Sequence, residues 1–133
     1  MGNIETVQAV YEAFGRGDVA TILSHLADDV AWDTRTPSFG LPWYEPRRGR
    51  DQVAGFFGDL AANVVLHKLE PTNFLVGGDQ VAAVFDIALE VKGSPELIED
   101  QEVHLWTFDG EGRISAFAHV CDRHAQALAY QRR

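Results

Sequence analysis

The spacing of hydrophobic residues changes along the chain, and this change limits the folds that the chain can adopt. In the first half, apolar residues recur every three or four positions, which predicts helices over about residues 4–14, 19–27 and 51–60. From Val64 onward, apolar and polar residues alternate, as is typical of strands. Helices followed by a run of strands indicate an α+β fold rather than an alternating α/β fold.

Turn residues divide the strand-rich part of the chain. Gly77-Gly78-Asp79 and Asp109–Gly112 are typical of hairpin turns, and Pro71 predicts a bend within a long strand. The expected strands are residues 30–34, 64–76, 81–91, 101–108 and 113–121, with a polar loop over 92–100 and a closing helix over 122–130. Residues 35–50 hold three of the five prolines and predict a long loop, and such loops often shape a site.

Length and charge narrow the classes of partner. A chain of 133 residues fits one domain, spanning 1–133. The formal net charge of −9 argues against nucleic acid and against an anionic membrane as partners. The single cysteine, Cys121, excludes an internal disulfide, and no segment approaches the apolar length of a membrane-spanning helix. We therefore expect a cytoplasmic protein.

Several short motifs resemble the nuclear transport factor 2-like superfamily in their order and spacing. Residues 11–18, with YEAF and GD, are similar to its first helix and turn, and residues 27–32, ADDVAW, to its first strand. Residues 49–57, with GRDQV and FF, resemble the entry to its third helix. The run VHLWTF at 103–108, then GRI at 112–114 and Asp122, is similar to the SnoaL-like polyketide cyclase branch.

This resemblance implies a specific architecture. N-terminal helices would pack into a strongly curved, mostly antiparallel sheet and enclose a cone-shaped pocket for a small hydrophobic molecule. A homodimer would form on the outer face of the sheet. The superfamily includes ketosteroid isomerases, polyketide cyclases, epoxide hydrolases, dehydratases and members without a catalytic role, so the fold alone does not define the chemistry.

Ionisable side chains share one face of each of the last two expected strands. Alternation along a strand groups Glu102 with His104 and Trp106, and Phe117 with His119 and Cys121. Registering both strands on the turn at 109–112, as the resemblance implies, directs these ionisable groups into the cavity. Val103 and Leu105 would then lie on the outer face. Buried ionisable groups need partners or have shifted pKa values, which suits them to proton transfer.

We expect His119 to act as a general base, His104 to donate to an enolate oxygen, and Glu102 to orient an imidazole. By resemblance, His104 lies near the oxyanion donor of ketosteroid isomerases, and His119 lies where SnoaL-like cyclases place their acid/base Asp. Thr34 falls at the isomerase base position, and regular alternation puts Asp33 on the opposite face. The alternative is that both histidines form only structural hydrogen bonds.

Further side chains are expected to contact the substrate. They are Tyr11, Trp32, Thr34, Trp43, Phe56, Phe57, Trp106, Phe117 and Cys121. Tyr11 lies on an apolar stripe and equally fits the core, and Cys121 equally fits a small hydrophobic role. No HxH, HExxH or CxxC spacing occurs, so neither a metal nor another cofactor is expected. Glu102 with the two histidines is the alternative metal set that the sequence leaves open.

Two kinds of function fit these features. The first is a small SnoaL-like isomerase, cyclase or lyase that acts on a hydrophobic carbonyl compound by cofactor-free acid–base catalysis, through isomerisation, aldol cyclisation or dehydration. The second is a non-catalytic protein that binds a small apolar ligand, with histidines that only hydrogen-bond it. A purely structural association module is a third reading, and it predicts a pocket filled by Trp and Phe side chains.

Overall fold

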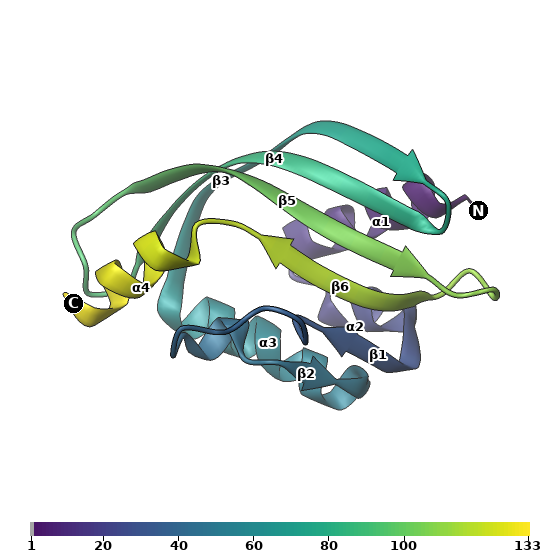
Figure 1. Cartoon of the computed structure of the whole chain (residues 1–133), viewed down its shortest axis with the longest axis horizontal. Helices are drawn as coiled ribbons and strands as arrows, with labels where there is room; N and C mark the ends of the chain where they lie inside the picture. The colour runs from purple at the N-terminus through teal and green to yellow at the C-terminus, as the bar shows by residue number, and fades with distance from the viewer. Residues whose placement is uncertain (1) are drawn as a thin grey trace.

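The computed structural model describes residues 2–133 and shows helices packed against one curved sheet (Figure 1). The helices are α1 (Asn3–Gly15), α2 (Val19–Ser24), α3 (Gly49–Asn63) and α4 (Arg123–Gln131), and a short 3-10 helix, η1, spans Pro42–Tyr44. The strands are β1 (Leu26–Trp32), β2 (Arg47–Arg48), β3 (Val64–Gly77), β4 (Gln80–Val91), β5 (Ile98–Phe108) and β6 (Ile114–Val120). The predicted α+β class is confirmed.

The described strands form a six-stranded sheet in the order β2-β1-β6-β5-β4-β3. Neighbouring strands run antiparallel, apart from the parallel pair of β1 and β6. The sheet arches over α1, α2 and α3 (Figure 1). Within residues 2–133, no helix has both the length and the apolar character needed to cross a membrane.

Irregular pairing in β3 accompanies the curvature of the sheet. The register of β3 against β4 shifts between Leu66 and Lys68 and again between Pro71 and Asn73. Such shifts increase local twist and bend a strand. The bend expected at Pro71 therefore coincides with a register shift in the structure.

Side chains on the concave face of the sheet form the core together with the apolar faces of the helices. On β4, every second residue from Val81 to Val91 is buried, as the alternation predicted. In α1, Val7, Val10 and Ala13 are buried against this face. Asp18 begins α2 as its N-cap, because its carboxylate accepts hydrogen bonds from the backbone and the hydroxyl of Thr21.

Several predicted boundaries are wrong, and pairing between distant strands explains two of them. The second helix stops at Ser24, not near residue 27, because Leu26 pairs with Ile114 at the start of β1. The expected loop over 92–100 is shortened by β5, which begins at Ile98 opposite Leu89. The long loop over 35–50 contains η1 and β2.

Candidate active site

A cavity lies between the concave face of the sheet and the helices. A largely apolar cavity with a few convergent polar groups is typical of a site for a small organic molecule. Most of its lining is apolar, and Glu102, His104 and His119 are its acidic and basic residues. Of the other residues expected to contact a substrate, the lining includes Tyr11, Trp32, Trp43, Phe56, Phe57, Trp106 and Phe117.

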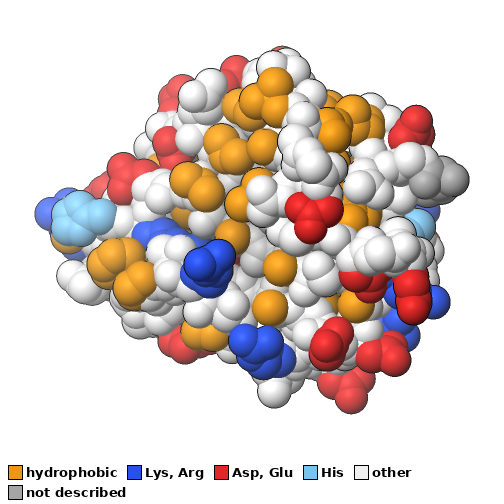
Figure 2. Space-filling view, turned by 45° about the vertical axis from the view of Figure 1, so that its right-hand side comes forward, with side chains coloured by type: hydrophobic (Ala, Val, Ile, Leu, Met, Phe, Trp, Pro, Cys, Tyr) orange, Lys and Arg blue, Asp and Glu red, His pale blue; other side chains and the backbone are white. Residues whose placement is uncertain are grey.

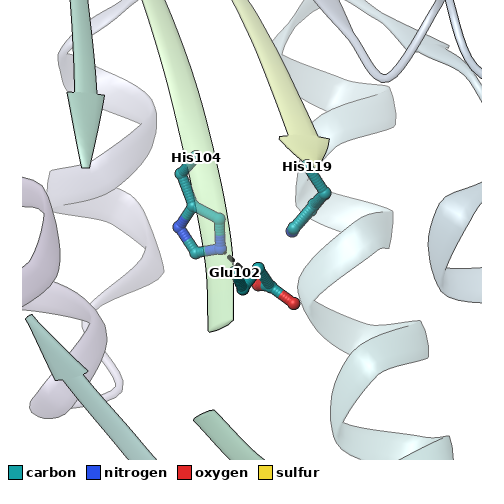
Figure 3. Close-up of side chains that lie close together, drawn as sticks. All are labelled: Glu102, His104 and His119. Atoms are coloured by element: carbon teal, nitrogen blue, oxygen red, sulfur yellow. Dashed lines mark hydrogen bonds and ion pairs between the residues drawn. The ribbon is translucent and has the colours of Figure 1, made fainter. Parts of the chain in front are cut away.

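The two histidines are direct neighbours across β5 and β6. The pairing of these strands places His104 opposite His119, and their ring centroids lie 5.0 Å apart. Burial alternates along β5, so that Glu102 lies on the same buried face two residues before His104. Figure 3 shows the three side chains pointing toward one another from the two strands.

His119 is held by a carboxylate from the end of β1. Its Nδ1 lies 2.7 Å from Oδ2 of Asp33, and its backbone N–H donates to Oδ1 of the same carboxylate over 2.9 Å. An ionised carboxylate accepts hydrogen bonds only, so the ring proton of a neutral His119 lies on Nδ1. In this tautomer Nε2, which lies on the side of the ring away from Asp33, carries no proton and has a free lone pair.

Asp33 is a site residue that the sequence placed on the wrong face. Its φ of 54° takes the backbone out of the extended conformation directly after β1 ends at Trp32, and this turns its side chain inward. Aspartate enters this left-handed region more readily than most residues, but nothing in the local sequence marks the position. Arg123, at the start of α4, also binds this carboxylate, because its Nη2 donates a hydrogen bond to Oδ1 of Asp33 over 3.1 Å.

His104 is held at both ring nitrogens. Its Nε2 contacts Oε2 of Glu102, and its Nδ1 lies 2.6 Å from the hydroxyl of Tyr11. The Tyr11 oxygen also accepts a hydrogen bond from Nε1 of Trp106 over 3.0 Å. A consistent assignment has Tyr11 donating to Nδ1 while Nε2–H donates to Glu102. Tyr11 is therefore both part of the cavity wall and the polar partner of His104.

Burial and these partners determine the charge of each group. Burial lowers the pKa of His104, which is therefore neutral at pH 7. Burial alone would raise the pKa of Glu102, but the hydrogen bond from His104, together with weaker interactions that include His119, lowers it. Burial would also raise the pKa of Asp33, but interactions with His119 and then with Arg123 outweigh this effect and lower the pKa. Both carboxyl groups are thus ionised near neutral pH.

The far side of His119 contains a second polar network, which links η1 to α4. Gln126 of α4 accepts from Nε1 of Trp43 over 2.9 Å and donates to the hydroxyl of Tyr44 over 3.0 Å. Burial raises the pKa of Tyr44 well above its usual value, so this hydroxyl remains protonated. Trp43 and Tyr44 come from the segment expected as a long loop, and both are buried and line the cavity.

Thr34 and Cys121 are the expected contact residues that lie away from this lining. Within the described residues, the cavity wall includes neither side chain. Thr34 follows the turn at Asp33, so the face expected from strand alternation does not extend to it. Cys121 lies behind Tyr44, with Sγ 3.2 Å from the hydroxyl, and burial raises the pKa of its thiol to about 12. The thiol is therefore protonated and not an activated nucleophile.

The curved sheet, the covering helices and the enclosed polar cluster define a class of small α+β proteins with an internal pocket. Comparison with known families then gives a narrower assignment. The SnoaL-like domain model matches residues 7–117, so the chain belongs to the SnoaL-like family. No match was found among curated protein sequences.

Solved structures share this fold over almost the whole chain. An NTF2-like protein of unknown function from Burkholderia pseudomallei has 25% identity and a TM-score of 0.84, with 97% of this chain and 98% of that chain covered. TerC, crystallised with polyporic acid, has 25% identity and a TM-score of 0.76 over the same shares of the two chains. A Xanthomonas campestris protein provisionally named a polyketide cyclase has 22% identity and a TM-score of 0.69, covering 96% and 95%.

Proposed function

We propose that this protein is a small-molecule enzyme that transfers a proton next to a carbonyl group of an apolar substrate. The observation that carries this proposal is the pair of Asp33 and His119, in which a buried carboxylate holds Nδ1 and leaves Nε2 as the basic nitrogen. General bases are oriented in this way in many enzymes, and an imidazole has a suitable basicity near neutral pH.

The proposed reaction begins at Nε2 of His119. This nitrogen takes a proton from the carbon next to the carbonyl, and the C–H electron pair moves onto the carbonyl oxygen as an enolate. The ionised Asp33 stabilises the imidazolium that forms. Return of the proton to another carbon gives isomerisation. Attack of the enolate carbon on a second carbonyl gives aldol cyclisation, and the new alkoxide then takes the proton from His119. Departure of a β-hydroxyl group as water, with the proton supplied by His119, gives dehydration.

His104 is the proposed donor to the enolate oxygen. Its Nε2–H donates to Glu102 in the structure, and a substrate oxygen entering beside Glu102 would compete for this hydrogen. Tyr11 supports that role because it donates to Nδ1 and so keeps the ring proton on Nε2. Glu102 thus orients His104, whereas His119 is oriented by Asp33.

The surroundings of the cluster favour an uncharged, largely apolar substrate. The polar groups lie among aromatic and aliphatic walls, where an uncompensated substrate charge would be costly. Family membership agrees with a small-molecule cyclase or isomerase, and TerC offers an example of a similar protein crystallised with an organic compound.

Hydrogen exchange offers a test that requires no knowledge of the natural substrate. Aromatic ketones such as 2-tetralone, incubated with the protein in D₂O, should exchange their α-hydrogens faster than in buffer, as followed by NMR. His119→Gln should reduce the enzyme-dependent rate by about 10²–10⁴-fold. His67→Gln is the matched control because its side chain is 46% exposed on β3. If 2-tetralone binds but wild type and His119→Gln exchange it equally, His119 is not the base.

We also propose that the protein forms a homodimer through the outer face of its sheet. Val84, Val103 and Val120 lie side by side across β4, β5 and β6, and Ala82, Leu105 and Ala118 form the next row. Val120 is 57% exposed. Figure 2 shows hydrophobic side chains gathered on the upper part of one face of the molecule, with acidic side chains mostly around the edge and one near the middle. An exposed apolar surface of this kind is typical of a protein interface.

A further inference from the structure

We propose that Glu102, His104 and His119 also form a binding site for a divalent transition-metal ion, with Zn²⁺ as the best-fitting ion. One donor atom from each residue lies within 4.8 Å of the other two. All three residues are buried, with relative exposures of 3%, 6% and 8%. Two imidazoles and a carboxylate are a ligand set that zinc accepts when a fourth position stays open.

The partners of the two rings orient the same nitrogen of each toward this point. Asp33 occupies Nδ1 of His119 and Tyr11 occupies Nδ1 of His104, which leaves the two Nε2 atoms as ligands. Histidine ligands commonly have a carboxylate or another polar partner on the far nitrogen, which fixes the ring and raises its basicity. Sequence spacing could not reveal this arrangement, because Asp33 follows β1 and Tyr11 lies in α1, both far in sequence from the two strands.

An unpartnered oxygen gives an independent reason to expect a cation. Oε1 of Glu102 is buried and has no hydrogen-bond donor within the described part of the chain. An ionised carboxylate oxygen without a partner in such a place is costly, and native structures rarely leave one unsatisfied. A cation bound between Glu102 and the two Nε2 atoms would satisfy it.

The site needs a modest adjustment to bind zinc. Ligand bonds of about 2.0–2.1 Å in a tetrahedron place the donor atoms about 3.3 Å apart. Small movements of the Glu102 carboxylate and of both imidazole rings would bring the donor atoms from within 4.8 Å to this separation, and would release the Nε2 of His104 from Glu102. The proton of His104 then moves to Nδ1, and Tyr11 changes from donor to acceptor, as a hydroxyl can. The fourth position faces the cavity and would take water or a ligand oxygen.

Metal binding would exclude the proton transfer proposed above, because both need the lone pair on Nε2 of His119. Zn²⁺ should therefore inhibit any α-hydrogen exchange that the metal-free protein performs. The metal proposal does not depend on that activity, and binding can be measured on the protein without substrate.

Isothermal titration of the full chain with ZnCl₂ tests the proposal, with Co²⁺ absorption as a report of coordination geometry. We expect one ion per chain, intense visible bands of four-coordinate Co²⁺, and loss of both in His119→Gln and Glu102→Gln. Asp33→Asn should weaken binding by about 10–100-fold, because Asp33 is not a ligand but orients one. His67→Gln, which removes a surface histidine beside Glu90, should bind as wild type.

Two results would overturn the proposal. One is the absence of binding by a folded wild-type protein, and the other is binding that persists in folded Glu102→Gln and His119→Gln. Circular dichroism establishes that each variant is folded. If His119→Gln does not fold, Glu102→Gln and Asp33→Asn decide the outcome, since they retain both imidazoles.

Discussion

At the scale of single residues, the backbone of Asp33 determines what His119 can do. A regular continuation of β1 would direct this side chain away from the cavity face, and the imidazole would lack its carboxylate. The positive φ at Asp33 instead brings the carboxylate to the ring, to the backbone N–H of His119 and to Arg123. One residue therefore joins the ends of β1 and β6 to the start of α4.

Replacing Asp33 by Asn should affect both catalysis and stability. The amide cannot stabilise an imidazolium, so α-hydrogen exchange should fall by about 10²–10⁴-fold. The variant also leaves Arg123, which is 4% exposed, without its charged partner. We expect the free energy of unfolding in urea to fall by about 2–3 kcal/mol.

Asp29→Asn is a suitable control for Asp33→Asn, because Asp29 is exposed on β1, the strand that ends just before Asp33. It should leave both the exchange rate and the urea midpoint unchanged. An Asp33→Asn variant with wild-type exchange would show that the carboxylate does not support the base, even if its stability falls as expected.

At the scale of helices and strands, the sequence predicts some features well and others poorly. The shared face of Glu102 and His104 on β5 follows from alternation alone, whereas the place of His119 opposite His104 also depends on a register shift between Thr107 and Phe108, beside the turn at 109–112. The contribution of Asp33 could not be predicted, because it depends on a departure from strand geometry. The hydrogen bond between Gln126 and Tyr44 could not be predicted either, since it joins segments that are distant in sequence.

The start of α2 gives a prediction about pH. Hydrogen bonds from the hydroxyl and the backbone N–H of Thr21, aided by Arg16, lower the pKa of the Asp18 carboxyl below its usual 3.8. Its stabilising effect should be fully present above pH 3.8 and lost as the pH falls through the lower pKa of the folded state. Asn can also cap a helix but does not titrate.

Urea unfolding of wild type and Asp18→Asn at a series of pH values measures this effect. The two proteins should differ most near neutral pH, where the carboxylate is charged, and the difference should shrink under strongly acidic conditions. The Asp29→Asn control should follow wild type at every pH. A difference between wild type and Asp18→Asn that stays constant down to pH values well below 3.8 would mean that charge on Asp18 does not contribute.

At the scale of the whole molecule, the sheet has two faces with different roles. The concave face encloses the polar cluster and the cavity, and the outer face presents rows of apolar residues on β4, β5 and β6. Neighbouring residues on β5 belong to different faces, so Val103 points outward between Glu102 and His104. A dimer on the outer face would therefore restrain the strand that carries two of the site residues, without contributing a side chain to the cavity.

The dimer can be tested by placing a charge on its proposed interface. Val120→Glu changes a side chain that is 57% exposed in the single chain, so folding should tolerate it. In a dimer the same carboxylate would be buried without a partner, which is strongly unfavourable. Light scattering coupled to size exclusion should give twice the chain mass for wild type and the mass of one chain for Val120→Glu.

Phe39→Asp is the control, since Phe39 is 54% exposed but lies in the loop after β1, and it should leave the wild-type mass unchanged. A wild-type monomer, or a Val120→Glu dimer, would show that this apolar surface does not join two copies of the chain.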